Sequence, residues 1–413
     1  MLKNAIVGQS GGPTAAINAT LAGIIRGAFQ SSKIDKIYGM TNGIQGFLDG
    51  NTRILNDFFK NEEDLELLKN TPAAALGSCR LKLPDVYSTA QKDILIYEKI
   101  FESLREKNIG YLFYIGGNDS MDTVKKLSIY AKKNNIGVKI IGVPKTIDND
   151  LNGTDHAPGY GSAAKYIAAT MQEICHDNAV YPIKSIVITE IMGRDAGWLT
   201  AAAAMPRLYG GKSPNLLYLP ESEFSDERFL FDIEEEFKKK PNIVIAVSEG
   251  IKYTDGRYIC ESCEKHDTDI FGNKQLSGTA NHLKYIIKEK FNCKVRTIEL
   301  NTPQRCASHI ASLCDIEESE NIGFESIKTA VNEEKSGIMM VFRRISKKPY
   351  QIKISYEDIT NIANEIKTVP LEYINEQKNN VTDECLEYIA PLITGEPKIT
   401  YNNGIPKFFV FKD

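Results

Sequence analysis

"YIGGNDSMDTVKKL" (residues 114–127) joins an apolar run to a segment of helical periodicity through two glycines. The apolar run, 111–117, is typical of a strand that is covered on both faces. A strand, a Gly-Gly turn and a helix often bind phosphate, because the first N–H groups of a helix have no partner within the helix. Asp119, however, places an anion at this junction. Asn118 and Asp119 could also serve simply to cap the helix.

The same alternation of short apolar runs and helical segments extends along the chain. Further strands are expected at residues 4–8, 138–144, 185–192, 215–221, 242–250, 294–300 and 337–345. Helices are expected at 15–29, 89–107, 120–134, 160–179, 226–240, 275–291 and 319–335. This alternation predicts parallel sheets with crossover helices. One sheet would need too many strands, so we expect two Rossmann-like, three-layer α/β domains with mainly parallel sheets.

Glycine, proline and asparagine interrupt the pattern at 149–161, which places a domain boundary there. We expect a first domain at 1–149 and a second at 150–345, with the chain crossing back to the first domain late in that span. Residues 346–413 are expected to form a C-terminal extension that covers the domains.

Composition excludes several classes of protein. The 413 residues contain 50 Lys+Arg and 54 Asp+Glu, a net charge of −4, so no basic field indicates nucleic acid. No apolar run reaches the roughly 18 residues that a membrane span requires. The opening "MLKNAIVG" lacks the layout of a signal peptide, and eight cysteines in a chain of this length fit a reducing cytoplasm better than a disulfide scaffold.

A second Gly-Gly junction, "GQSGGPTAAIN" (8–18), follows the first predicted strand. Gly11 and Gly12 allow the backbone to approach a ligand closely, and Pro13 and Thr14 suit the start of a helix. A tight strand-to-helix turn without a ligand is the alternative. Because ligands of open α/β sheets bind at the carboxyl ends of strands, two such junctions in one domain favour a phosphate site.

A third loop, "PKTIDNDLNGTDH" (144–156), also follows a strand. It carries Lys145, Asp148 and Asp150 within six residues. A carboxylate near a cation and phosphates can accept the proton of a sugar hydroxyl that attacks phosphorus. A polar loop with Asx turns is the structural alternative.

Four shorter segments add arginines and a glutamate beside small residues: "LGSCR" (76–80), "EIMGRDAGW" (190–198), "VSEG" (247–250) and "NTPQR" (301–305). Arg80, Arg194 and Arg305 are candidate phosphate ligands, and Glu249 can accept from sugar hydroxyls. Each residue alone could equally be a surface residue. The set gains its meaning only if the fold brings the four segments together.

The order of these motifs resembles the 6-phosphofructokinase family, over about residues 3 to 310. The resemblance implies a phosphofructokinase-type fold, with the phosphoryl donor held by the first domain and the sugar phosphate by the second. It implies that Asp148 is the base for the C1 hydroxyl of fructose 6-phosphate and that Gly12 and Arg80 hold the donor. The sugar-phosphate ligands that it implies are Thr146, Ile147, Asp148, Lys184, Met192, Gly193, Arg194, Glu249, Arg296, Thr302, Pro303, Gln304 and Arg305. Lys184 and Arg296 would reach the 6-phosphate from a neighbouring subunit, which implies a homodimer or homotetramer with shared active sites.

Two residues indicate the donor. ATP-using members have glycine where this sequence has Asp119 and Lys145, whereas the pair present here resembles the pyrophosphate-dependent branch. Asp119 would obstruct and repel the rest of a nucleotide, and Lys145 would supply a cation for the departing phosphate. Asn118 stands where ATP-using relatives have a metal-binding aspartate, and we expect Mg²⁺ near it.

We therefore expect a cytoplasmic, reversible, pyrophosphate-dependent 6-phosphofructokinase of glycolysis and gluconeogenesis. Its partners would be fructose 6-phosphate and pyrophosphate, with no nucleic acid and no membrane. Two alternatives are an ATP-dependent 6-phosphofructokinase and a non-catalytic subunit that binds sugar phosphates.

Overall fold

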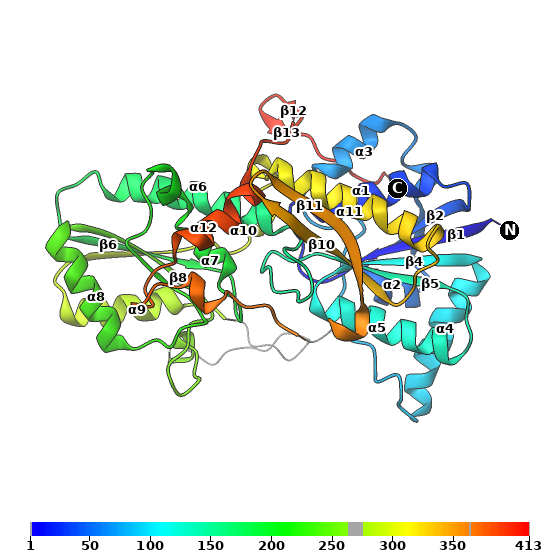
Figure 1. Cartoon of the computed structure of the whole chain (residues 1–413), viewed down its shortest axis with the longest axis horizontal. Coiled ribbons are helices and arrows are strands. Elements are labelled where there is room, and N and C mark those ends of the chain that lie inside the picture. Colours follow the sequence, from blue (N-terminus) through cyan, green and yellow to red (C-terminus); the bar gives the residue numbers. More distant parts are fainter. Residues whose placement is uncertain (1, 263–275, 363–364, 413) are drawn as a thin grey trace.

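The computed structural model describes residues 2–262, 276–362 and 365–412 of the chain. Two β-sheets lie beside each other along the long axis of the molecule, and helices cover both faces of each sheet (Figure 1). The larger sheet contains the N-terminal strands, drawn in blue and cyan. The smaller sheet lies in the green half of the ribbon.

The larger sheet has seven strands in the order β11-β10-β5-β4-β1-β2-β3. The strands from β10 to β2 in this order are parallel, and both edge strands are antiparallel. Their bounds are β1 Lys3–Gln9, β2 Ile34–Met40, β3 Thr52–Ile54, β4 Ile109–Gly116, β5 Lys139–Pro144, β10 Ile338–Lys347 and β11 Tyr350–Asp358. Since β1, β4 and β5 are parallel neighbours, the loops that follow them meet at one edge of the sheet.

Two layers of helices enclose this sheet. One layer contains α1 (Ile17–Gln30) and α11 (Leu313–Val331), and the other contains α4 (Gln91–Glu106) and α5 (Asn118–Lys133). Successive strand residues point to opposite faces, so both sets of alternate residues in β4 and β5 are buried, each under one helix layer. This two-sided burial explains why the strands are continuous apolar runs.

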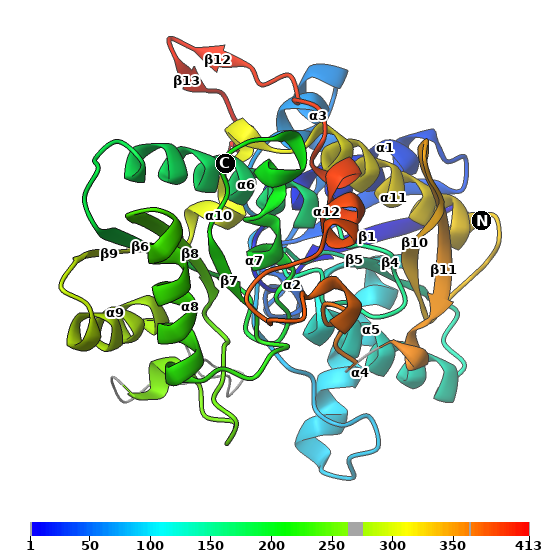
Figure 2. The same ribbon diagram turned by 60° about the vertical axis from the view of Figure 1, so that its left-hand side comes forward.

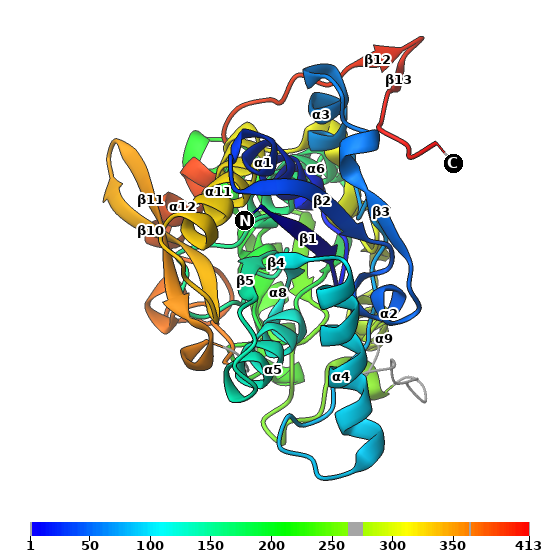
Figure 3. The same ribbon diagram turned by 90° about the vertical axis from the view of Figure 1, so that its right-hand side faces the viewer.

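Helices α1 and α11 pack backbone against backbone. A Cβ added to Gly23 would lie 1.9 Å from the carbonyl oxygen of Glu320, and one added to Gly323 would lie 2.2 Å from that of Thr20. Figure 3 shows the two helices side by side over the large sheet, although almost 300 residues separate them in the sequence. Only glycine at both positions permits this approach.

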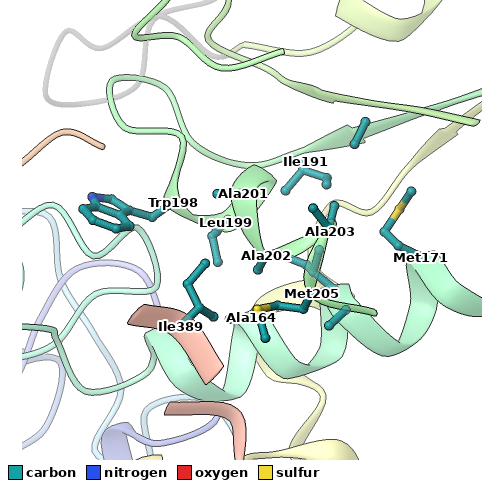
Figure 4. Packing of buried hydrophobic residues seen from close by; sticks show 14 of the residues in the cluster. Ala164, Met171, Ile191, Trp198, Leu199, Ala201, Ala202, Ala203, Met205 and Ile389 are labelled. Carbon is teal, nitrogen blue, oxygen red and sulfur yellow. The ribbon is translucent and has the colours of Figure 1, made fainter. Parts of the chain in front are cut away.

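The smaller sheet has the order β7-β8-β6-β9, and all its strands are parallel. Its strands are β6 Ser185–Ile191, β7 Leu216–Tyr218, β8 Asn242–Ser248 and β9 Lys294–Glu299. One face is covered by α8 (Asp226–Lys239) and α9 (Thr279–Lys290), and the other by α6 (Tyr160–Asn178), α7 (Trp198–Ala202) and α12 (Asp383–Ile389). Figure 4 shows this second face, where Ile191 of the sheet, Leu199 of α7 and Ile389 of α12 enter one core.

Short elements complete the chain: α2 Gly43–Leu48, α3 Glu62–Lys69, α10 Pro303–Cys306, and the hairpin strands β12 Tyr401–Asn402 and β13 Ile405–Pro406. The hairpin projects from the molecule (Figure 2), and the C-terminus lies beside α1 of the N-terminal half (Figure 1). There the ring of Phe409 stacks on that of Phe59, with centroids 4.6 Å apart. In the ranges that the structure describes, no helix combines the length and the apolar character needed to cross a bilayer.

The prediction of an α/β fold with mainly parallel sheets is confirmed. Several local details differ from the expectation. Strand β2 was not expected, and α11 begins at Leu313 rather than at residue 319. Helix α1 begins at Ile17 rather than at residue 15, and the Ala16 and Ile17 N–H groups donate to the Thr14 hydroxyl at 3.2 and 2.9 Å. The expected boundary at residue 345 falls inside β10, and the segment that follows adds β11 to the large sheet.

Candidate active site

A cavity of about 330 Å³ lies between the carboxyl ends of the strands of the two sheets. Loops after β1, β4 and β5 form one wall, and loops after β6, β8 and β9 form the other. The predicted site residues that line it are Gly12, Arg80, Asn118, Asp119, Lys145, Thr146, Ile147, Asp148, Met192, Arg194, Glu249 and Arg305. The fold therefore brings together motifs that are dispersed over most of the chain.

The Gly-Gly loop after β1 lines the cavity on the side of the larger sheet. Gly11 has a φ of 78°, and a Cβ there would lie 3.2 Å from the Lys145 ammonium. The carbonyl of Gly11 accepts from the Ser78 hydroxyl at 2.6 Å, and its N–H donates to the Cys79 carbonyl at 3.3 Å. These bonds fix the "LGSCR" segment against the loop and carry Arg80 into the cavity wall.

Lys145 and Asp148 meet in the loop after β5. Lys145 is 2% exposed, and its ammonium donates to the Gly12 carbonyl at 2.7 Å. Burial lowers the pKa of Lys145 to about 8, although Asp148 and Asp150 favour its charged form. Burial raises the pKa of Asp148 to about 7; Asp150 acts in the same direction and Lys145 opposes it. A carboxyl group with a pKa near 7 suits proton transfer at neutral pH.

The loop itself is held by local hydrogen bonds. The Thr146 hydroxyl accepts the Asp148 N–H at 3.1 Å. Asn149 adopts a φ of 53°, and its side-chain oxygen accepts the Ala157 N–H at 3.1 Å. The turn at the start of this loop is thus closed by a threonine hydroxyl and not by an Asx side chain. A hydrogen-bonded loop is compatible with chemistry, because Asp148 at the end of this turn lines the cavity.

Asn118 and Asp119 open α5 at the edge of the cavity. The N-cap is Gly117, and neither side chain caps the helix, so the capping alternative is wrong. Asn118 donates through Nδ2 to one Asp150 oxygen at 3.1 Å. Asp119 is exposed at the rim.

The oxygens of this corner fit a divalent cation. Asn118 Oδ1 and Asp150 Oδ1 are both buried, and neither has a hydrogen-bond partner. Buried oxygens without donors are suitable ligands for a hard cation. Among the described residues no group of three or more His, Cys, Asp or Glu side chains could hold a metal. A cation here would therefore take part of its shell from water or from phosphates of the substrates.

The wall after β6, β8 and β9 presents two arginines and a glutamate. The Nε atoms of Arg194 and Arg305 are buried and have no hydrogen-bond partner, so both N–H groups are available to an anion. Burial raises the pKa of Glu249 to about 8, and one of its oxygens accepts the Gly193 N–H at 3.3 Å. The "VSEG" glycine is required by packing, because a Cβ on Gly250 would lie 1.9 Å from the Arg194 carbonyl oxygen.

Some predicted ligands support the cavity without lining it. Gln304 is 1% exposed, and its side-chain oxygen accepts the Met192 N–H at 3.1 Å. Gly193 has a φ of 138° and contacts Glu249 as described above. Thr302 and Pro303 are exposed at the start of α10 and are not part of the lining.

Lys184 and Arg296 lie outside the cavity of their own chain. Arg296 is opposite Val187 in the sheet, and one of its nitrogens lies 3.8 Å from a carboxylate oxygen of Asp177. The Lys184 ammonium lies 5.1 Å from the ring centroid of Phe237. Their expected role across a subunit boundary stays a prediction.

Asp195 is a lining residue that the sequence did not single out. It stands directly after Arg194 in the quoted "EIMGRDAGW", and its carboxylate is 3.7 Å from the Lys252 ammonium. Its place next to Arg194 in that motif is the feature of the sequence from which Asp195 could have been predicted as a lining residue.

The fold and the cavity define an α/β protein whose two sheets enclose a buried carboxyl group, that of Asp148, beside lysine and arginine side chains on both walls. A family model described as Phosphofructokinase matches residues 4–328, and the chain belongs to the phosphofructokinase family.

Several relatives match almost the whole chain. Pyrophosphate–fructose 6-phosphate 1-phosphotransferase of Halomonas elongata is 37% identical over 407 residues, covering 98% of this chain and 95% of the relative. The enzyme of the same name from Methylococcus capsulatus is 36% identical, with 98% and 95% covered. A sulfofructose kinase of Alkalicoccus urumqiensis is 31% identical, with 94% and 95% covered. The crystal structure of the pyrophosphate-dependent phosphofructokinase of Nitrosospira multiformis superposes with a TM-score of 0.87 at 35% identity, covering 98% of this chain and 95% of that one.

Proposed function

We propose that this chain transfers a phosphoryl group from pyrophosphate to the C1 hydroxyl of fructose 6-phosphate. The products are fructose 1,6-bisphosphate and phosphate, and the reaction is reversible. The observation that carries the proposal is the buried Lys145 ammonium, placed between the Gly12 loop and the Asp148 carboxylate. Relatives at 34–37% identity that bear the name of this activity support it.

In this mechanism Asp148 accepts the proton of the C1 hydroxyl as that oxygen attacks phosphorus. The Lys145 ammonium and the Arg80 guanidinium hold the pyrophosphate and neutralise the charge on the departing phosphate. Arg194, Arg305 and the segment after Met192 hold the sugar phosphate on the opposite wall. Two binding walls that face one base orient both substrates for in-line transfer.

A divalent cation, which we assign as Mg²⁺, would be held by Asn118 and Asp150 and would neutralise charge on the transferred phosphoryl group. The two unpartnered oxygens described above support this assignment. An amide in place of a carboxylate leaves the shell dependent on the substrate phosphates.

Asp119 makes pyrophosphate a better donor than ATP. The carboxylate is exposed at the rim of the cavity, and we propose that the part of a nucleotide beyond its β-phosphate would have to pass it. Pyrophosphate ends before this point, whereas ATP would bring more negative charge against the carboxylate.

We assign donor binding to the unit built around residues 1–149, to which the chain returns with α11, β10 and β11. We assign sugar binding to the rest of the span 150–345, and the residues from 346 onward extend and cover both units. We also propose a homodimer or homotetramer in which Lys184 and Arg296 of one subunit complete the site of another. The exposed apolar side chains of Val180, Tyr181 and Ile183, next to Lys184, support an interface there. We also propose a cytoplasmic location, because eight cysteines in a chain of this length fit a reducing compartment better than a disulfide scaffold.

The test is donor-dependent formation of fructose 1,6-bisphosphate by the purified chain, with Mg²⁺ and either pyrophosphate or ATP. We expect turnover with pyrophosphate and little with ATP. Turnover with ATP alone would establish the ATP-dependent alternative. Binding of fructose 6-phosphate without turnover of either donor would establish the non-catalytic subunit.

A further inference from the structure

A C-terminal strap, defined here as residues 365–388, crosses between the two halves of the molecule. It follows β11 of the larger sheet and ends in α12, whose buried residues Cys385 and Leu386 belong to the core of the smaller sheet. Figure 2 shows the strap and α12 in front of the strands, between the two halves. The residues of this strap do not line the cavity.

The strap holds the loop that carries Asp148. The Lys367 N–H donates to the Asp150 carbonyl at 2.8 Å, beside a bridge between Leu151 and Ile366. The Lys367 ammonium donates to the Asp155 carbonyl and, at 3.3 Å, to the Thr154 carbonyl. One residue therefore binds the loop at both ends, through its main chain and its side chain.

Tyr388 reinforces the same loop. Its hydroxyl donates to the Asp155 carbonyl at 2.5 Å and accepts from Asn149 Nδ2 at 3.1 Å. The Asp155 carboxylate is in turn fixed by Arg344, at 2.9 Å from Nη2. The backbone from Asn149 to Asp155 thus has few degrees of freedom left.

The other side of Lys367 contacts the turn that carries Arg194. The Trp198 indole N–H donates to the Lys367 carbonyl at 3.2 Å, and the Lys367 ammonium lies 5.1 Å from the centroid of that ring. Two residues further on, the Val369 N–H shares one Glu221 oxygen with the Gly197 N–H, both at 2.8 Å. Lys367 is thus bonded to loops from both walls of the cavity.

We propose that Lys367 is a positioning residue, which fixes the loop of Asp148 relative to the turn of Arg194 without touching either substrate. This inference rests on the proposed function, in which the base on one wall must face a sugar held by the other. A displacement of about 1 Å at a reacting centre can reduce turnover about 100-fold.

The experiment compares Lys367→Met in two backgrounds, the unsubstituted chain and Asp148→Ser. In the first background we expect kcat to fall about 10- to 100-fold, with KM values for both substrates within about threefold. In the Asp148→Ser background the same change should alter the residual kcat less than about twofold, because a base that is absent cannot be misplaced. Lys348→Met, on the exposed side chain paired with Glu387 at 3.3 Å, is the matched control and should not change kcat.

A purely structural role would reduce the active fraction equally in both backgrounds, and that result would overturn the proposal. An unchanged kcat, or an effect on KM alone, would also overturn it. If Lys367→Met does not fold, Tyr388→Phe is the substitute, because it removes a hydroxyl of α12 that binds the same loop. This variant should show a smaller loss of kcat, and the loss should again depend on the presence of Asp148. Turnover of the unsubstituted chain with pyrophosphate tests the proposed function separately, since that measurement does not depend on how Lys367→Met changes kcat in either background.

Discussion

Replacement of Lys145 by methionine tests the central electrostatic argument. Methionine keeps most of the volume of the stem and removes the charge, which in the structure is buried and 2.7 Å from the Gly12 carbonyl oxygen. A unit charge about 4 Å from the departing phosphate contributes about 4 kcal/mol at an effective dielectric constant of about 20. That energy corresponds to a loss of about 10³-fold in kcat.

A second effect acts in the same direction. Burial raises the pKa of Asp148 to about 7, and Lys145 is one of the charges that oppose this rise. Without the ammonium, the pKa of Asp148 rises further and more of the base is protonated at neutral pH. Part of the lost activity should therefore return as the pH is raised, because the base is again ionised.

The assay is the rate of formation of fructose 1,6-bisphosphate at saturating pyrophosphate, between pH 6 and 9. KM for the sugar phosphate should change little, since Arg194 and Glu249 lie on the other wall. Lys139→Met, at the opposite end of β5, is the control for loss of a lysine. A kcat within about threefold of the parent value would refute the assignment of Lys145 to the departing phosphate.

Four further outcomes are expected. Asp148→Ser should lose most turnover while calorimetry still detects binding of fructose 6-phosphate; near-normal turnover would remove it as the base. Asp119→Gly combined with Lys145→Gly should weaken use of pyrophosphate and admit some ATP, and an unchanged donor preference would contradict the role of these side chains in donor choice. Burial raises the pKa of Glu190 from 4.5 to about 7, so ionisation of this side chain lowers the free energy of unfolding as the pH rises from about 4.5 to 7. Glu190→Gln cannot ionise, so its free energy of unfolding in urea should increase relative to the parent by up to about 3 kcal/mol between pH 4 and pH 8. Mixing inactive Asp148→Ser with inactive Arg296→Ala should restore activity in hybrid oligomers if sites are shared, and no recovery after confirmed subunit exchange would count against shared sites.

Most strands and helices, and many of the residues that line the cavity, could be predicted from the sequence. Near-continuous apolar runs identify buried parallel strands, and the geometry of parallel sheets brings the loops after them to one edge. Lys145, Asp148 and Asp119 could therefore be expected to meet, and the structure places all three around one cavity.

Long-range pairing was not accessible, because periodicity reports on a residue's own element and not on its neighbours. Nothing local in "GIMMVFRRI" (337–345) shows that β10 lies next to β5 or that β11 extends the same sheet. Lys367 lies in a segment expected only to cover the domains, and its contacts with both walls depend on that unforeseen path. Similarly, only the structure shows that Asn118 bonds Asp150 instead of capping α5.

The close contact of α1 with α11 has a consequence for biosynthesis. The smaller sheet is formed by strands between residues 185 and 299, whereas the larger sheet needs α11, β10 and β11 from residues 313–358. Until those residues leave the ribosome, the apolar face of β5 and the glycine-lined groove of α1 have no permanent cover. We therefore expect all strands of the smaller sheet to emerge before the larger sheet can be completed, although α12 covers one face of the smaller sheet only later. We expect chaperones to protect the N-terminal third in the interval.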